Sequence, residues 1–413
     1  MSEKPRRPGN LILIVLLAGW IVCSCNASDP PEASSDRSVQ TRITDESEET
    51  TGEVPVTEGP TLSSSEETMN SEISSVEFAE ERVAQMTLEE KVGQMFFATW
   101  VSGNVPEEIE NWNLGGLVLF APDFEKSDPV SIRNKIDSYQ KASAIPLLIG
   151  VDEEGGTVVR ISRFTQFRVE RFLSPQDLFA QGGLDAIRSD TVEKSKFLLS
   201  CGINVNLAPV CDVSTDAADF IYKRSFGQDA KATSDYVAVV VEEMKKEGIG
   251  ISLKHFPGYG NNTDTHFGIA VDKRDYETFI TSDFLPFLAG IEKGAGSVMV
   301  SHNIIDCMDA NLPASLSPIV HRVLREELGF EGVIMTDDLS MGALKPYTGN
   351  QEAAVLAVLA GNDMLIGSAY AEQIPEVIRA VLSGEINEQI IDEAVTRILV
   401  WKTELGLIQS SVE

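Results

Sequence analysis

The sequence is poor in basic residues. It contains 33 Lys and Arg against 64 Asp and Glu, which gives a formal net charge of −31 at pH 7. Proteins that bind nucleic acid neutralise its phosphates with clustered cations. No basic patch interrupts this acidic chain, so nucleic acid is excluded as an expected partner.

Cysteine is scarce as well. Of five cysteines, two lie close to the N-terminus, which leaves Cys201, Cys211 and Cys307. Three is an odd number, and their spacing matches no metal site and no disulfide framework. We expect buried thiols that serve as small apolar side chains.

The N-terminus lacks an apolar run long enough for a membrane-spanning helix. The run Leu11 to Val22 follows a basic start and is too short to span comfortably, so residues 1–25 are interpreted as a signal peptide. The segment Val22 to Cys25 resembles a bacterial lipobox, which implies lipidation of Cys25 and an extracytoplasmic protein anchored to the cell membrane. A plain secretory signal and an uncleaved anchor are the alternatives.

Residues 26–76 have almost no aromatic residues and are dominated by Ser, Thr, Glu, Asp and Pro. From Asn26 to Ser75 there are 12 acidic residues against 2 basic ones. Such a segment cannot bury enough apolar surface to offset the entropy of ordering. We predict a disordered acidic linker, with a binding tail as the alternative.

Residues 77–413 have the pattern of one folded domain. After a capping box at Thr87 and Glu90, short apolar runs alternate with helical stretches. The runs cover residues 95–99, 116–120, 147–151, 205–210, 249–253, 297–301, 333–336 and 364–366. Continuous hydrophobicity is typical of parallel strands covered by helices. Eight such units predict an α/β fold, a (β/α)8 barrel, and a doubly wound open sheet is the competing layout.

Polar residues at the strand ends favour the barrel. They are Asp152, Asp212, Lys254-His255, His302-Asn303 and Asp337-Asp338. In a barrel these ends meet at one rim, where active sites lie. Charged groups around an apolar mouth suit a neutral, hydroxyl-rich ligand. No phosphate-binding Gly-rich loop and no dinucleotide fingerprint appears.

Asp264 and His266 form an Asp-x-His pair on a Gly-flanked loop. A carboxylate two residues before an imidazole can fix its tautomer and prepare it for proton transfer. A turn Asp beside a surface His is the plainer alternative. A metal site shared with His255 is another, but no H-x-x-x-H or H-x-H pair is present, so no metal is expected.

Several motifs follow one another in a fixed order. They are MTLEEKVGQM at Met86, GVDEEGG at Gly150, NVNLAPVCDV at Asn204, KRSFG at Lys223, KHFPGYGNNTDTH at Lys254, PASLS at Pro313 and GVIMTDDLSMGAL at Gly332. With them the stretch from Thr87 to Leu407 resembles family 3 glycoside hydrolases, in the branch of β-N-acetylhexosaminidases. The resemblance implies a glycosidase barrel that uses no cofactor.

The resemblance also implies roles for individual residues. Asp337 matches the family's nucleophile, which forms a covalent glycosyl-enzyme in a retaining mechanism. Asp338 beside it is expected to be structural, because adjacent strand residues point opposite ways. The acid/base of this branch is the His of an Asp-x-His dyad, here His266 with Asp264 behind it. Two-domain relatives use a Glu from a second domain, for which we see no room here.

The motifs carry over four residues that hydrogen-bond the hydroxyls of the terminal sugar: Asp152, Arg224, Lys254 and His255. A salt bridge that holds the loop after the fourth strand is the alternative for Arg224. Asp212 and His302 are expected in supporting positions. One departure is Tyr259, since many members of the branch have KHFPGHG where this chain has KHFPGYG.

The resemblance implies a retaining exo-β-N-acetylglucosaminidase that acts on soluble cell-wall fragments, those with N-acetylglucosamine linked to N-acetylmuramic acid. The partners expected are this carbohydrate substrate and the membrane, and the chain is expected to be monomeric. One alternative is a phosphorylase, since some relatives with the His acid use phosphate as acceptor and a His does not repel it as a Glu would. The other is a non-catalytic sugar-binding lipoprotein.

Overall fold

The computed structural model describes residues 75–409 except 100, 102, 263–267, 269, 345 and 349. All described residues belong to one compact unit. None of the helices in this part of the chain is long and apolar enough to cross a membrane. The predicted lipidation site, Cys25, and the predicted pair Asp264 and His266 lie outside the described residues.

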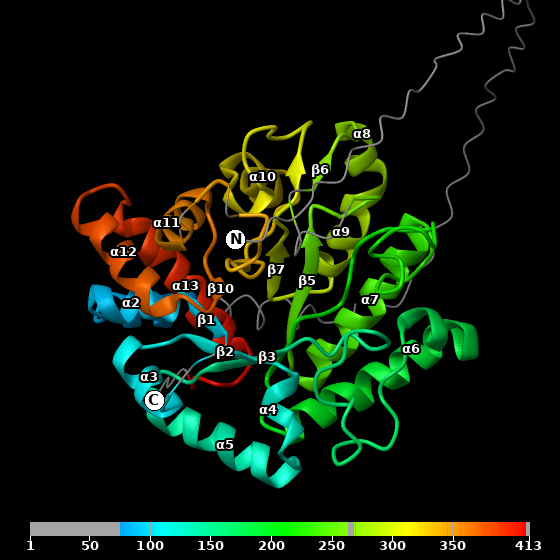
Figure 1. Ribbon diagram of the computed structural model, residues 1–413, viewed down its shortest axis with the longest axis horizontal. Helices are drawn as coiled ribbons and strands as arrows, with labels where there is room; N and C mark the ends of the chain where they lie inside the picture. Colours follow the sequence, from blue (N-terminus) through cyan, green and yellow to red (C-terminus); the bar gives the residue numbers. More distant parts are fainter. Residues whose placement is uncertain are drawn as a thin grey trace, which may run out of the picture. The chain divides into compact units, whose positions relative to one another are not determined.

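Eight parallel strands form the centre of this unit, and most of them are labelled in Figure 1. They are β1 Phe96–Thr99, β2 Gly116–Leu119, β3 Leu148–Val151, β4 Val205–Asn206, β5 Gly250–Phe256, β7 Ser297–Val300, β9 Val333–Thr336 and β10 Leu365–Gly367. They pair in the order β10-β1-β2-β3-β4-β5-β7-β9. A parallel bridge between Met335 and Met364 joins the two outer strands, so the sheet closes. The predicted (β/α)8 barrel is confirmed, and the open sheet is excluded.

The strands lie within one residue of the predicted apolar runs at each end, with two exceptions. β4 ends at Asn206 instead of Val210, and the residues up to Val210 contribute one isolated parallel bridge, between Val210 and Lys254. β5 continues to Phe256, beyond the predicted end at Leu253. The extension places Lys254 and His255 inside the strand instead of after it.

Helices connect the strands and lie outside them (Figure 1). A helix over residues 75–83 comes first. The principal later ones are α2 Leu88–Gln94, α3 Val105–Trp112, α5 Pro129–Ala142, α6 Pro175–Ser200, α7 Ala230–Glu247, α9 Phe284–Glu292, α11 Asn350–Ala360, α12 Tyr370–Leu382 and α13 Glu388–Glu404. The predicted capping box is confirmed: Thr87 Oγ1 accepts from the Glu90 N–H at 3.2 Å, and Glu90 Oε2 accepts from the Thr87 N–H at 2.8 Å.

The barrel is packed with side chains through its middle. Every residue of β1, β2 and β3 is buried. The ring of Phe97 lies so close to Gly150 that a Cβ there would be 2.5 Å from Phe97 Cζ. Space for a ligand is therefore left only toward the ends of the strands.

The three cysteines among the described residues are free thiols. Cys201 and Cys211 are buried, as expected, and burial raises the pKa of both. Cys307 is exposed, which corrects the expectation of three buried thiols. It lies in the turn after β8 Ile304–Ile305, which pairs with β6 Val271–Asp272 in a small sheet beside the barrel.

Candidate active site

A cavity of about 800 Å³ lies at the carboxyl ends of the barrel strands. Asp152 follows β3, Lys254 and His255 end β5, and Asp337 follows β9. Arg224 comes from the loop between β4 and α7. The structure thus brings these five predicted residues to the wall of one cavity, although they span almost 190 positions of sequence.

Lys254 is the most deeply buried cation of the site. Its side chain is withdrawn from solvent, and Nζ lies 2.7 Å from both Asp152 Oδ1 and Glu154 Oε1. Burial alone would lower the pKa of Lys254, but the two carboxylates outweigh burial and raise that pKa above its ordinary value. Lys254 therefore stays charged beside the cavity.

Glu154 links Lys254 to Arg224. The Arg224 guanidinium donates to both carboxylate oxygens of Glu154, from Nη2 at 2.7 Å and from Nε at 3.0 Å. Burial alone would raise the pKa of Glu154, yet Arg224 and Lys254 hold it well below its usual range. The salt bridge considered for Arg224 is present, and the same side chain lines the cavity.

His255 is fixed in one tautomer by its two neighbours. Its Nε2 lies 3.1 Å from Arg224 Nη2, and its Nδ1 lies 2.8 Å from Asp212 Oδ2. A guanidinium can only donate and a carboxylate only accept, so Nε2 is the acceptor and Nδ1 carries the proton. The imidazole is therefore held with a proton on Nδ1.

Asp212 holds the turn that follows β5. Besides the His255 ring, it accepts from the main-chain N–H of His255 at 3.2 Å and of Tyr259 at 2.8 Å. Tyr259 is buried, and its ring meets His255 edge to face at 5.1 Å between centroids. Asp212 lies behind the cavity wall, in the supporting position expected of it.

Asp337 follows the end of β9 and is only partly buried. Its N–H donates to Val300 O at 3.0 Å, and its Oδ1 accepts from the Asp338 N–H at 2.8 Å. Asp338 lines the cavity too, because β9 ends at Thr336 and strand alternation no longer applies. The structural role expected of Asp338 fits its turn with Ser340, whose N–H and hydroxyl donate to Asp338 Oδ1, but strand alternation is not the reason for it.

His302 contacts the segment that follows β9. It is fully buried, with Nδ1 2.7 Å from Ser315 Oγ and Nε2 3.0 Å from the main-chain oxygen of Asp338. A carbonyl oxygen only accepts, so Nε2 donates to Asp338. His302 therefore fixes the residue next to Asp337 and lies in the supporting position expected of it.

Two charged residues at the site were missed by the sequence reasoning. Glu154 stands third in a run of three acidic residues, and the only local signal is the pair of positive-φ glycines that follows it. Arg160 lines the cavity with Nη2 3.4 Å from Asp152 Oδ2 and its guanidinium over the ring of Phe120. Its position eight residues after Asp152 gives no periodic signal.

The predicted dyad, Asp264 and His266, lies outside the described residues, in the segment between β5 and β6. The described residues on either side of it are Asn262 and Gly268. Within the part of the chain that is described, no group of three His, Cys, Asp or Glu side chains is placed to hold a metal ion.

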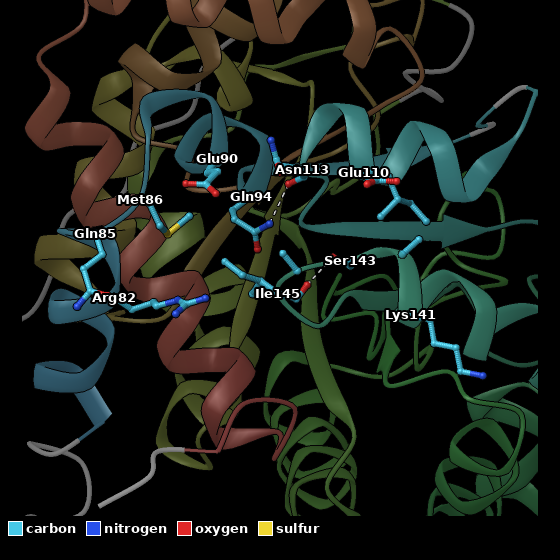
Figure 2. Close-up of a pocket in the computed structure, with 13 residues that line it drawn as sticks. Arg82, Gln85, Met86, Glu90, Gln94, Glu110, Asn113, Lys141, Ser143 and Ile145 are labelled. Carbon is cyan, nitrogen blue, oxygen red and sulfur yellow. Dashed lines mark hydrogen bonds between the residues drawn. The ribbon is translucent and has the colours of Figure 1, made fainter.

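A second cavity, of about 450 Å³, lies at the opposite ends of the strands (Figure 2). It is lined by residues that precede β1, β2 and β3, among them Gln94, Asn113 and Ile145. None of the predicted site residues borders it. Since barrel enzymes carry their sites at the carboxyl ends of the strands, the cavity around Asp337 is the candidate active site.

Comparison with known proteins agrees with this fold. The model of the glycosyl hydrolase family 3 N-terminal domain matches residues 87–400. A β-hexosaminidase of Nitrosomonas eutropha is 32% identical over 256 residues, which are 61% of this chain and 73% of that protein. A solved family 3 β-N-acetylglucosaminidase from Paenibacillus sp. str. FPU-7 has a TM-score of 0.73 and 28% identity, over 79% of this chain and 64% of that one. The β-glucoside phosphorylase BglX, 23% identical with a TM-score of 0.72 over 81% of this chain and 60% of that one, shares the fold.

Proposed function

Because the chain belongs to glycosyl hydrolase family 3, we propose that this glycoside hydrolase is a retaining exo-β-N-acetylglucosaminidase. It removes terminal β-linked N-acetylglucosamine, with Asp337 as nucleophile. The observation that carries the proposal is the single cavity that Asp337 shares with Asp152, Arg224, Lys254 and His255. The similar β-hexosaminidase and β-N-acetylglucosaminidase support the choice of sugar.

The four predicted sugar-binding residues suit a polyhydroxylated ring. The carboxylate of Asp152 accepts from hydroxyls, and the cations Lys254 and Arg224 donate to them. His255 adds an imidazole edge to the wall, and its two nitrogens are paired with Arg224 and Asp212. All four are tied to one another or to Glu154 and Asp212, so little ordering is required when the sugar binds. A neutral sugar with several hydroxyls is thus the ligand class that this wall fits best.

The reaction proceeds in two displacements at the anomeric carbon. In the first, a carboxylate oxygen of Asp337 bonds to that carbon while the bond to the leaving oxygen breaks, and His266 gives its proton to that oxygen. In the second, His266 takes a proton from water, the water oxygen bonds to the carbon, and Asp337 leaves as a carboxylate. Asp264 orients the imidazole throughout, so the configuration at the anomeric carbon is retained.

The proposal extends to where the enzyme acts. We propose that the chain is exported, is lipidated at Cys25 and works as a monomer on soluble cell-wall fragments that carry N-acetylglucosamine on N-acetylmuramic acid. The signal-like segment 1–25 and the acidic segment 26–76 support this location. Membrane fractionation tests it, because Cys25→Ser is expected to move the enzyme into the soluble fraction.

A substrate series tests the reaction. Aryl β-glycosides of N-acetylglucosamine, N-acetylgalactosamine and glucose are compared in the wild type and in Asp337→Ala. The wild type is expected to prefer N-acetylglucosamine, and Asp337→Ala is expected to lose turnover by a factor on the order of 10⁴ or more while it still folds. Full activity in Asp337→Ala would overturn the mechanism. Release of sugar 1-phosphate on addition of phosphate would show a phosphorylase instead.

A further inference from the structure

A row of three aromatic rings runs along the wall of the active-site cavity. His255 meets Tyr259 with ring centroids 5.1 Å apart, and Tyr259 meets Phe220 with centroids 5.8 Å apart. His255 and Phe220 are the two ends of the row, and both line the cavity. Two ring contacts through Tyr259 therefore connect the buried imidazole of His255 to Phe220.

Phe220 is the solvent-facing end of the row. His255 is buried, whereas Phe220 remains 36% exposed. Among the exposed large apolar side chains of the described residues, Phe220 alone lines this cavity. An aromatic face left open to water in a binding cavity is a surface that an apolar ligand face can cover favourably.

The ring of Phe220 is held from behind. Tyr259 is buried and packs with Val210 and Ile221 in a small apolar cluster apart from the main core. Ile221 directly follows Phe220, so this cluster also anchors the loop that carries Phe220. Tyrosine at position 259 therefore supplies the edge contact that supports the exposed ring.

We propose that Phe220, supported by Tyr259, stacks against the second sugar ring of the substrate, on the leaving-group side. The inference rests on the proposed function, because exo cleavage places the terminal sugar at the buried end of the cavity and the leaving sugar toward its rim. The apolar C–H face of a pyranose covers the Phe220 ring. Phe220 is thus a specificity-determining residue that favours a disaccharide over a substrate with a small leaving group.

The test compares two substrates, N,N′-diacetylchitobiose and methyl β-N-acetylglucosaminide, by their ratio of kcat/KM. In Phe220→Ala the ratio is expected to fall about fivefold, as the loss of one aromatic contact predicts. Phe220→Trp keeps an aromatic face and is expected to keep the ratio. Phe179→Ala is the matched control, since Phe179 is equally exposed on α6 but lies outside the cavity. An unchanged ratio in Phe220→Ala would overturn the proposal.

A binding measurement separates this proposal from the proposed function. In the Asp337→Asn background, calorimetry is expected to show about fivefold weaker binding of diacetylchitobiose after Phe220→Ala, with N-acetylglucosamine binding changed far less. If the wild type binds the disaccharide through Phe220 but cleaves neither substrate, the proposed function is wrong and the stacking contact stands. If the wild type cleaves both and Phe220→Ala affects them equally, the stacking contact is wrong and the function stands.

Discussion

The ammonium of Lys254 and the carboxylate of Glu154 lie 2.7 Å apart, and both are almost completely withdrawn from solvent. Glu154 also binds Arg224 through two hydrogen bonds, and Lys254 also binds Asp152. Charges buried in this way are stabilised only as long as all partners remain. The sugar-binding residues Asp152, Lys254 and Arg224 therefore form one buried charge network. Glu154 connects them at its centre and does not line the cavity.

Glu154→Gln is expected to damage both folding and binding. The amide keeps the shape of the carboxylate but leaves Lys254 with one carboxylate partner, Asp152, and removes the salt bridge of Arg224. Loss of one partner from a buried charge group costs about 3 kcal/mol. We expect a loss of that size in the free energy of unfolding from urea titration, and a rise in KM of at least about tenfold.

Asp137→Asn is the control for that experiment. It breaks the ion pair between Arg133 and Asp137, which has a similar length of 3.0 Å but is about half exposed on both sides. Pairs of this kind contribute less than about 1 kcal/mol. If Glu154→Gln were as stable and as active as Asp137→Asn, the buried charge network would not have the importance given to it here.

Asp212→Asn is expected to weaken sugar binding without contact to the sugar. Asp212 accepts from the His255 ring on one oxygen and from the Tyr259 N–H on the other. An amide has one acceptor, so its NH₂ must face a donor on one side, at a cost of about 1–3 kcal/mol. We expect KM to rise about tenfold, and ¹⁵N NMR to show that the His255 tautomer is no longer single.

Asp216→Asn provides the comparison for Asp212→Asn. Asp216 lies on the same loop but is exposed, where it accepts from the Ala218 N–H. KM and the His255 signals are expected to stay unchanged. If both substitutions raised KM equally, the rise would come from a disturbed loop and not from a change at the His255 imidazole.

The barrel could be predicted because its strands are buried on both faces and end in polar residues. Each strand then appears as an uninterrupted apolar run, and Lys254, His255 and Asp337 mark where runs stop. The sequence does not show which of the polar residues after a strand face the cavity. Asp152, Glu153 and Glu154 are adjacent acids, yet only Asp152 lines the cavity.

The other two acids of that run differ from each other in a way that sequence does not express. Glu153 accepts from the main-chain N–H groups of Arg160, Ile161 and Ser162, so it shapes the loop after β3. Glu154 neutralises two cations that come from β5 and from the loop after β4. These partners are set by the closure of the barrel, which brings distant strands together. Glu154 could therefore not be found from spacing alone.

His266→Ala is expected to separate substrates by their leaving groups. A good leaving group such as 2,4-dinitrophenol needs little protonation, whereas a sugar or methanol needs a full proton transfer. We expect a loss on the order of 10³-fold for the methyl glycoside and at most about tenfold for formation of the covalent intermediate from the dinitrophenyl glycoside. Mass spectrometry should then detect a sugar bound to Asp337. An equal loss on both substrates would exclude His266 as the acid.

Lys402→Met is expected to stabilise the protein in a pH-dependent way. Lys402 on α13 is fully buried and donates to Gln94 Oε1 at 2.7 Å, while Gln94 Nε2 donates to the main-chain oxygen of Asn113 (Figure 2). Burial lowers the pKa of Lys402 to about 7. In the unfolded chain the same lysine has a pKa of about 10.4. Between these values the unfolded chain holds a proton that the folded chain lacks, so the wild type gains stability as pH rises through this window. Below about pH 7 Lys402 is charged in both the folded and the unfolded state, and the full cost of burying its charge applies.

Urea titration should show Lys402→Met stabilised by about 2 kcal/mol at pH 6 and by much less at about pH 9. Lys141 is exposed and lines the cavity of Figure 2 together with Gln94, so Lys141→Met should show no such difference between the two pH values. An equal gain for Lys402→Met at both pH values would mean that packing and not charge is responsible.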